Sequence, residues 1–110
     1  MIEQRIREIE ATLSQSERIP PESKEELSRL LADLKAEVQA LTETHQSQAD
    51  SIAKHAHISA ETAVREKKDA HEVEAALEGL NDSVKEFETS HPRLTETVNR
   101  LANMLSNMGI

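Results

Sequence analysis

The stretch VEAALEGLNDSVKEFETSHPRLTETVNRLANMLSNM, Val73 to Met108, decides the fold that we predict for this chain. Its large apolar residues recur with alternating gaps of four and three, first up to Phe87 and again after Pro92. This alternation places side chains along one side of a helix. The stretch therefore predicts two apolar stripes: Val73, Leu77, Leu80, Val84 and Phe87, then Leu94, Val98, Leu101, Leu105 and Met108.

Pro92 separates the two stripes, since proline disfavours a helical conformation in the residue before it. We expect the first helix to end near Thr89 and the second, capped by Ser90 or His91, to run from Pro92 to Asn107. A single helix kinked at Pro92 is the alternative, because His91 keeps the spacing between the stripes. Gly79 weakens the first helix but does not interrupt its phase.

The N-terminal part repeats the same spacing on either side of Ile19-Pro20-Pro21. Pro21 suits the first turn of a helix, where its missing N–H would be unpaired anyway. The short connection predicts that the two helices fold back on each other as a hairpin. Their stripes are Ile2, Ile6, Ile9 and Leu13, then Leu27, Leu31, Leu34, Val38 and Leu41.

The middle of the chain begins with a polar segment, Thr42 to Asp50, which indicates either a hinge or a weak continuation of the helix. Asp50 or Ser51 then suits the N-cap of the helix that follows. Alanines then recur with the four-three spacing, which indicates either a closely packed helix face or simply a good helix former. A single helix from Ala49 to Thr89, about 60 Å long, is compatible with this pattern. The repeat comprises Ala49, Ala53, Ala56, Ala60, Ala63 and Ala70, with Lys67 at the one missing position.

Composition excludes several classes of function. The chain has 110 residues, 36% of them hydrophobic and 31% charged, and a net charge of −8, which repels phosphate backbones. Without cysteine there is no disulfide or thiol chemistry. Apolar runs are too short to span a membrane. The N-terminus lacks the apolar core of a signal peptide, so we expect a cytoplasmic protein of bacterial type with neither nucleic acid nor membrane as partner.

No residue pattern points to catalysis, a cofactor or a metal. The chain lacks the Gly-x-x-x-x-Gly-Lys that holds nucleotide phosphates. Glu88 and His91 form the one Glu-x-x-His motif, whereas a di-iron bundle needs two such motifs and further glutamates. We interpret the carboxylates as solvated helix faces and expect no enzyme. The histidines are His45, His55, His57, His71 and His91.

The C-terminal residues carry a resemblance. Phe87-Glu88-x-x-His91-Pro92-x-Leu94, followed by a terminal Asn107-Met108-Gly109-Ile110, resembles a family of short bacterial proteins classed only as a domain of unknown function. The resemblance implies an N-terminal helical hairpin, a variable middle and a C-terminal helix pair. It makes the alanine-rich segment look like an insertion, and it implies no activity, cofactor or catalytic residue.

We therefore predict an all-α protein of about four helices with coiled-coil-like packing: a hairpin (1–41), an alanine-rich middle (42–72) and a C-terminal helix pair (73–110). The thin stripes favour a homodimer that acts as a non-enzymatic interaction module. Alternatives are a regulator of a separate enzyme or ATPase, or, less favoured, a metal-binding protein. The expected oligomer seam is Val73, Leu77, Leu80, Val84 and Phe87. The expected partner-binding residues are Leu101, Met104, Leu105, Met108 and Ile110.

Overall fold

A computed structural model describes residues 2–17, 19–65 and 69–109, and side chains at the C-terminal end as far as Asn107. These residues form α-helices joined by short connections, with one 3-10 turn and no strand among them. The elements are α1 (Ile2–Ser14), α2 (Pro21–Thr42), α3 (Gln46–Ala63), α4 (Ala70–Val84), the 3-10 turn η1 (Lys85–Phe87) and α5 (Pro92–Gly109). The all-α prediction is confirmed, but the described part holds five α-helices rather than about four.

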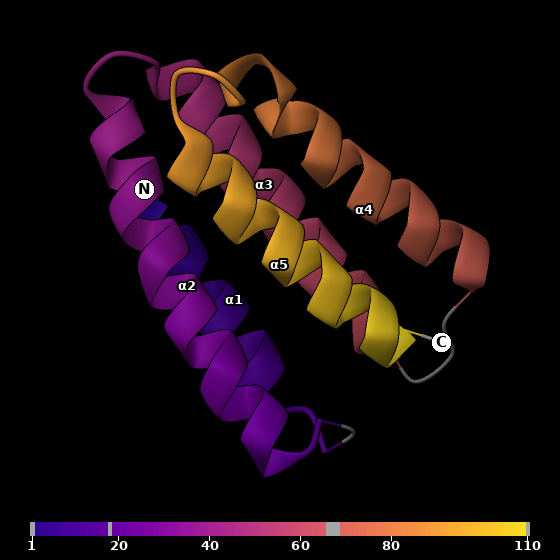
Figure 1. Ribbon diagram of the computed structural model, residues 1–110. Helices are drawn as coiled ribbons and strands as arrows, with labels where there is room; N and C mark the ends of the chain where they lie inside the picture. Colours follow the sequence, from indigo (N-terminus) through magenta and orange to yellow (C-terminus); the bar gives the residue numbers. More distant parts are fainter. Residues whose placement is uncertain (1, 18, 66–68, 110) are drawn as a thin grey trace.

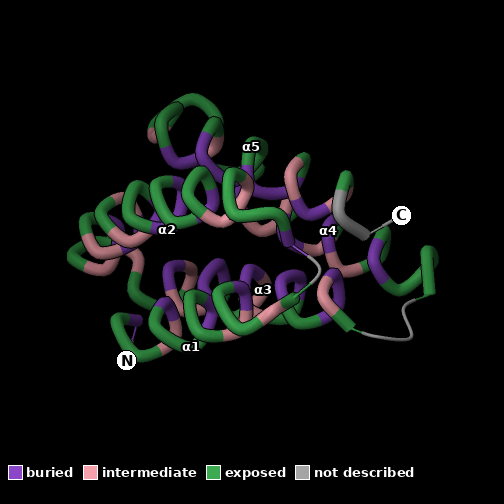
Figure 2. The backbone as a smooth tube through the Cα atoms, turned by 90° about the horizontal axis from the view of Figure 1, so that it is seen from below, coloured by how far each residue is buried: buried purple, intermediate pink, exposed green. Residues whose placement is uncertain are grey.

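Consecutive helices run antiparallel, as Figure 1 shows, in an up-and-down arrangement. Helix α3 packs against each of the other α-helices, whereas α4 packs only against α3, α5 and η1. In Figure 2, α2 and α5 lie above α1 and α3, and the buried positions face the space that the helices enclose. The centre of the fold is therefore α3 and not the C-terminal stretch from which the prediction began.

Helices α1 and α2 form the predicted hairpin. The chain leaves α1 at Ser14 and enters α2 at Pro21, where proline occupies the first turn. Lys24 Nζ donates a hydrogen bond to the backbone oxygen of Ser14 at 2.9 Å, which joins the end of one helix to the start of the next. Every residue of the two predicted stripes is buried, so the four-three spacing identified the inner face of both helices.

The alanine repeat of α3 is a packed face. Five of the six alanines are buried, and Ala70, which begins α4, is exposed. Small side chains let α4 approach closely enough for Ser59 Oγ to donate a hydrogen bond to the backbone oxygen of Ala76 at 3.1 Å. Of the two interpretations of the repeat, the structure supports the closely packed face. The buried alanines are Ala49, Ala53, Ala56, Ala60 and Ala63.

The single long helix from Ala49 to Thr89 is wrong. Helix α3 ends at Ala63, and α4 starts at Ala70 and runs back along it (Figure 1). The longest dimension of the molecule is 37 Å, too short for a helix of about 60 Å. The physical reason lies at Asp69, whose carboxylate accepts a hydrogen bond from the backbone N–H of His71 at 2.8 Å and caps a new helix.

Two other helix ends differ from the prediction. Helix α3 starts at Gln46 after an N-cap at His45, so Asp50 and Ser51 lie inside it and not at its cap. Helix α4 ends at Val84, before the 3-10 turn, rather than near Thr89. The break at Pro92 is confirmed, and the kinked continuous helix is wrong because α5 reverses direction there (Figure 1). Helix α5 continues to Gly109, slightly beyond Asn107.

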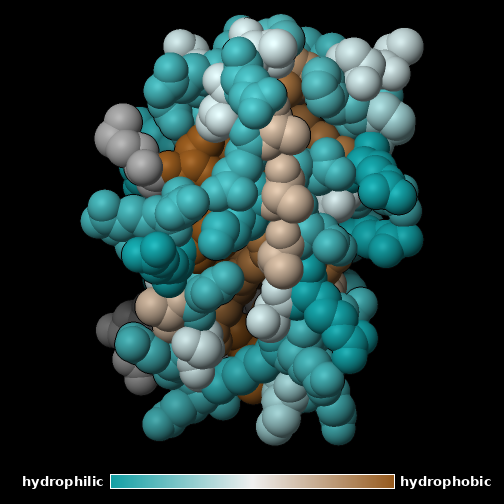
Figure 3. Space-filling model, turned by 90° about the vertical axis from the view of Figure 1, so that its left-hand side faces the viewer, coloured by the Kyte–Doolittle hydropathy of each residue, from teal (hydrophilic) through white to brown (hydrophobic). Residues whose placement is uncertain are grey.

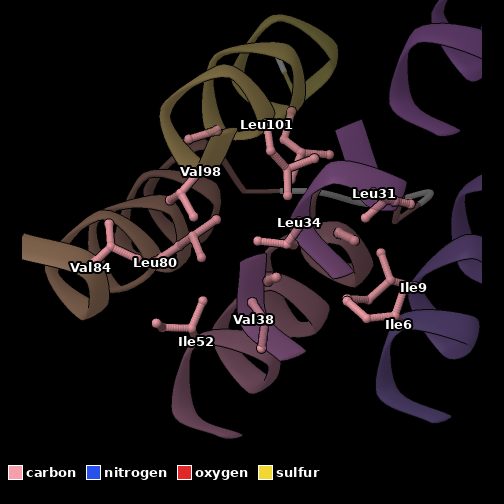
Figure 4. Close-up of a cluster of buried hydrophobic side chains, with 14 of the residues drawn as sticks. Ile6, Ile9, Leu31, Leu34, Val38, Ile52, Leu80, Val84, Val98 and Leu101 are labelled. Atoms are coloured by element: carbon pink, nitrogen blue, oxygen red, sulfur yellow. The ribbon is translucent and has the colours of Figure 1, made fainter. Parts of the chain in front are cut away.

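One hydrophobic core joins residues from all three predicted segments, 1–41, 42–72 and 73–110. Figure 4 shows side chains from α1 to α5 converging, with Leu34 of α2 and Leu80 of α4 completely buried. The radius of gyration of 12.9 Å matches a compact chain of this length, for which about 13 Å is expected. Within the described residues, no helix combines the length and apolar character needed to cross a membrane.

Candidate functional site

A groove of about 500 Å³ runs between α4 and α5. Its floor is apolar, because Leu77 and Ala102 lie at the edge of the buried contact between the two helices. Its walls carry carboxylates from α4 and amide and hydroxyl groups from both helices. The lining residues are Glu74, Leu77, Glu78, Asn81, Asp82, Lys85, Ala102, Asn103 and Ser106.

The helical repeat of α4 places the acidic side chains of this groove. Glu74, Glu78 and Asp82 follow one another at four-residue intervals beside the buried stripe, so they form a line along the helix. All three are exposed. Lys85 pairs with Asp82 at 3.2 Å, whereas Glu74 and Glu78 make no ion pair with any described residue.

Asn81 is the one described side chain that leaves a buried polar atom without a hydrogen bond. Its Oδ1 is buried and has no partner among the described residues. An unsatisfied buried acceptor costs about 1–3 kcal/mol relative to a satisfied one. Asn81 also lines the α4–α5 groove, but its Oδ1 is buried and is not exposed to a ligand there.

The predicted seam residues all lie in the core of a single chain. Val73, Leu77, Leu80, Val84 and Phe87 are buried against residues of the same chain, with Leu77 the most exposed at 8%. Their burial comes from α3 and α5, which cover the stripe of α4 on two sides. The structure thus assigns the stripe to packing within one chain, and self-association stays a prediction.

The predicted partner-binding residues are only partly available for contact. Leu101 and Leu105 are completely buried, and Met104 is half-buried against the core. The side chain of Met108 and the whole of Ile110 lie outside the described residues. The α5 residues beside these positions that line the groove are polar: Asn103, which is exposed, and Ser106, which is half-buried. The described apolar residues of this set pack inward, and a docking surface on α5 stays a prediction.

Sequence reasoning missed the groove residues because it judged each acidic residue separately, as part of a solvated face. The signal that was present is the four-residue spacing of Glu74, Glu78 and Asp82, which brings three carboxylates onto one side of α4. No sequence pattern indicated that Asn103 and Ser106 line the groove, since their position there depends on how α5 packs beside α4.

A second groove, of about 200 Å³, lies between α1 and α2, with Leu13, Leu27 and Leu31 at its floor. On the side of the molecule seen in Figure 3, brown apolar side chains show between teal polar ones. The two charged residues of this groove, Glu10 and Lys24, balance each other. Among the large hydrophobic residues of the described part, Ile58 is the exposed one, with 42% of its surface accessible.

Three aromatic rings gather where the α2–α3 turn meets the start of α5. The rings of His45 and His91 each pack edge-to-face against Phe87, at centroid distances of 5.3 and 5.4 Å. His91 Nδ1 also lies 2.9 Å from the hydroxyl of Ser90, and Glu88 is exposed. This arrangement is typical of packing at the end of a helical bundle, and it does not bring a carboxylate and an imidazole together as metal ligands.

His57 of α3 contacts α1 through its ring nitrogen Nδ1 and contacts a residue of its own helix through Nε2. Its Nδ1 is 3.2 Å from Arg5 Nη1, and its Nε2 is 3.1 Å from Glu61 Oε1. Nδ1 also lies 3.6 Å from Oε2 of Glu8 on α1, so the imidazole faces one guanidinium and two carboxylates. Across the described ranges, no three His, Asp or Glu side chains converge closely enough to hold a metal ion.

Comparison with known proteins places the chain in a family but not among proteins of assigned activity. A family model described as "Domain of unknown function (DUF4404)" matches residues 31–110, from the middle of α2 to the C-terminus. The matched range includes the α4–α5 groove and runs through the alanine-rich segment that we interpreted as an insertion. No curated protein and no solved structure matches. Because the family model matches well over half of the chain, this protein belongs to the DUF4404 family, a domain of unknown function.

Proposed function

We propose that this protein is a non-enzymatic helical interaction module that binds another protein in the groove between α4 and α5. The observation that carries the proposal is the composition of this groove, an apolar floor of Leu77 and Ala102 bordered by charged and amide side chains. Protein interfaces commonly combine an apolar centre with a polar, solvent-accessible rim. The groove also lies entirely within the range that the family model matches.

The bundle beneath the groove supports a rigid docking surface. Leu80 and Val84 of α4 and Val98 and Leu101 of α5 are buried against one another and the rest of the core (Figure 4). A partner therefore meets two helices that the core already holds in position, which reduces the ordering cost of binding. A partner that is itself an enzyme or ATPase would make this protein its regulator.

Site-specific photo-cross-linking in the cells that make the protein tests this proposal. A photoreactive amino acid replaces Asn103, which is exposed in the α4–α5 groove. Ser28, which is exposed in the α1–α2 groove, serves as the matched control position in a second groove. We expect a discrete cross-linked protein from Asn103 that is absent from Ser28, identified by mass spectrometry. Identical products from the two positions, or none from Asn103, would contradict a docking surface at this groove.

The same experiment reports on self-association. A product with twice the mass of the 12.3 kDa chain, formed from Asn103 and not from Ser28, would identify a second copy as the occupant of the groove. In that case the homodimer would form through the groove and not through the buried stripe of α4. A heterologous product would instead identify the partner directly.

A further inference from the structure

We propose that the occupant of the α4–α5 groove is a basic amphipathic helix of a partner protein, with lysine or arginine residues one helical turn apart. This inference rests on the proposed docking function and adds the chemistry of the partner. Three features of the groove support it: its net charge compared with that of other grooves, the spacing of its carboxylates and its apolar floor.

The charge of the α4–α5 groove is unbalanced. Three carboxylates, Glu74, Glu78 and Asp82, face one ammonium group, Lys85, which leaves a net charge of −2 (three negative charges and one positive). Lys85 is already paired with Asp82, so the unneutralised charge lies at Glu74 and Glu78, toward the start of α4. An excess of negative charge along a groove attracts cationic groups and repels anionic ones.

Three other depressions lined by described residues lack this combination. In the α1–α2 groove, the negative charge of Glu10 and the positive charge of Lys24 cancel. The groove between α2 and α5 contains Arg93 and Arg100 beside its three carboxylates, Asp33, Glu37 and Glu96. Arg100 pairs with Glu96 at 2.7 Å. The α1–α2 groove and the α2–α5 groove therefore each contain cationic side chains that neutralise at least part of their negative charge.

A fourth depression, near the N-terminus, contains two carboxylates, Glu3 and Asp50. Glu3 is not available there, because its Oε1 accepts a hydrogen bond from Gln39 Nε2 at 2.9 Å and its Oε2 lies 3.8 Å from Arg7. The α4–α5 groove differs in that neither Glu74 nor Glu78 has an ion pair among the described residues, and the two lie one turn apart on the same helix.

The spacing of the glutamates suits a helix as the occupant. Glu74 and Glu78 are four residues apart, so they project from α4 at an interval of about 6 Å along its axis. A helix that lies along the groove presents lysine or arginine at the same interval when the cations are four residues apart. Its neighbouring apolar side chains would contact Leu77 and Ala102, which form the floor. Asn81 and Asn103 supply amide groups for polar contacts beside them.

A phosphate-bearing partner does not fit this groove. The carboxylates would repel a nucleic acid backbone or an anionic lipid headgroup, and no described cation of the groove is left unpaired to offset them. The partner chemistry that the groove accommodates is an apolar stripe flanked by positive charge, which is the surface of a basic amphipathic helix.

Titration with synthetic helical peptides tests the inference. The peptides share one apolar stripe and one tryptophan and differ only in carrying lysine, glutamine or glutamate at the flanking positions. The protein contains no Trp or Tyr, so fluorescence anisotropy of the peptide tryptophan reports binding without a protein signal. We expect the lysine peptide to bind at least tenfold more tightly than the glutamine peptide, about 1.4 kcal/mol, and the glutamate peptide not to bind.

A matched pair of variants localises the binding. Glu74→Gln with Glu78→Gln removes two charges from the groove. Glu22→Gln with Glu26→Gln removes two charges at the same spacing from the exposed face of α2. All four sites are exposed, so the variants should fold, and their thermal unfolding is measured alongside. We expect the groove variant to bind the lysine peptide roughly tenfold more weakly than the native protein does. The α2 variant should bind it with nearly unchanged affinity.

The outcomes separate this inference from the proposed function. Equal weakening by both variants would mean that the overall negative charge, and not the groove, attracts the peptide, and this would overturn the inference. Equal binding of the lysine and glutamine peptides would also overturn it, while leaving a docking groove in place. If no peptide binds, the basic-helix inference fails, and cross-linking from Asn103 still decides independently whether the groove receives a partner.

Discussion

The imidazole of His55 on α3 covers Gly79 on α4. A Cβ atom at Gly79 would lie 3.3 Å from Nδ1 of His55 and 3.5 Å from Cε1. The glycine thus marks the point where the alanine face of α3 and the backbone of α4 approach each other. The same approach allows the hydroxyl of Ser59 to donate a hydrogen bond to the backbone oxygen of Ala76, nearly one turn before Gly79 on α4.

Gly79→Ala should stabilise the protein slightly. The backbone of Gly79 is helical, without a positive φ, so alanine gains about 1 kcal/mol of helix propensity. The tight contact is with a half-exposed ring that can move outward, and moving it offsets part of the gain. We expect a net increase in the free energy of unfolding of about 0.5 kcal/mol in urea titrations. In a His55→Ala background, where the contact is absent, the gain should approach the full propensity difference. Destabilisation in both backgrounds would contradict this account.

Asp69→Ala should destabilise the protein by about 1 kcal/mol, because it removes the carboxylate that caps α4. The matched control is Asp50→Ala inside α3, a residue that the sequence had favoured as a cap and that caps no helix in the structure. That change should alter the stability by less than about 0.5 kcal/mol. Chemical denaturation of the two variants compares them directly, and equal effects would mean that α3 and α4 do not begin where the structure places them.

Leu80→Ala should lower the free energy of unfolding by about 2–5 kcal/mol, since Leu80 is fully buried between helices. Because the neighbours of Leu80 belong to the same chain, the substitution should lower the unfolding midpoint by about the same amount at every protein concentration. Lys85→Ala, an exposed change, should have little effect. A midpoint that rises with concentration in the native protein and not in Leu80→Ala would place Leu80 at a contact between chains.

Asn81→Leu should raise the thermal stability and weaken the binding of a basic peptide. The substitution removes a buried acceptor that has no partner, which should stabilise the protein by about 1 kcal/mol. For a domain of this size, that corresponds to an increase in Tm of about 4–8 °C. Asn103→Leu, on the exposed opposite wall, should leave the Tm nearly unchanged. Lower stability in Asn81→Leu would show that its amide supports α4 instead of serving the groove.

The sequence alone determined which side of each helix is buried. A four-three spacing of large apolar residues has one physical solution, a stripe on one face, so Ile6, Leu34, Val84 and Leu101 could be identified as core residues without coordinates. The reversals at Pro21 and Pro92 follow from the conformations that proline excludes. The boundary at Asp69 was also encoded, since its carboxylate with Glu72 three residues later is typical of a helix start. It was overlooked because the alanine repeat continued in phase across it.

Only the tertiary structure decided what covers each stripe. The stripe of α4 could equally have met a second chain, because periodicity defines an apolar face without naming its partner. Helix α3 lies at the centre because its alanine side chains are small enough for neighbouring helices to approach closely. That face stabilises the protein only when those helices pack against it, which the sequence of α3 alone does not specify. The groove arises in the same way: Glu74 and Ser106 lie far apart in the sequence and share one surface only because α4 and α5 run side by side.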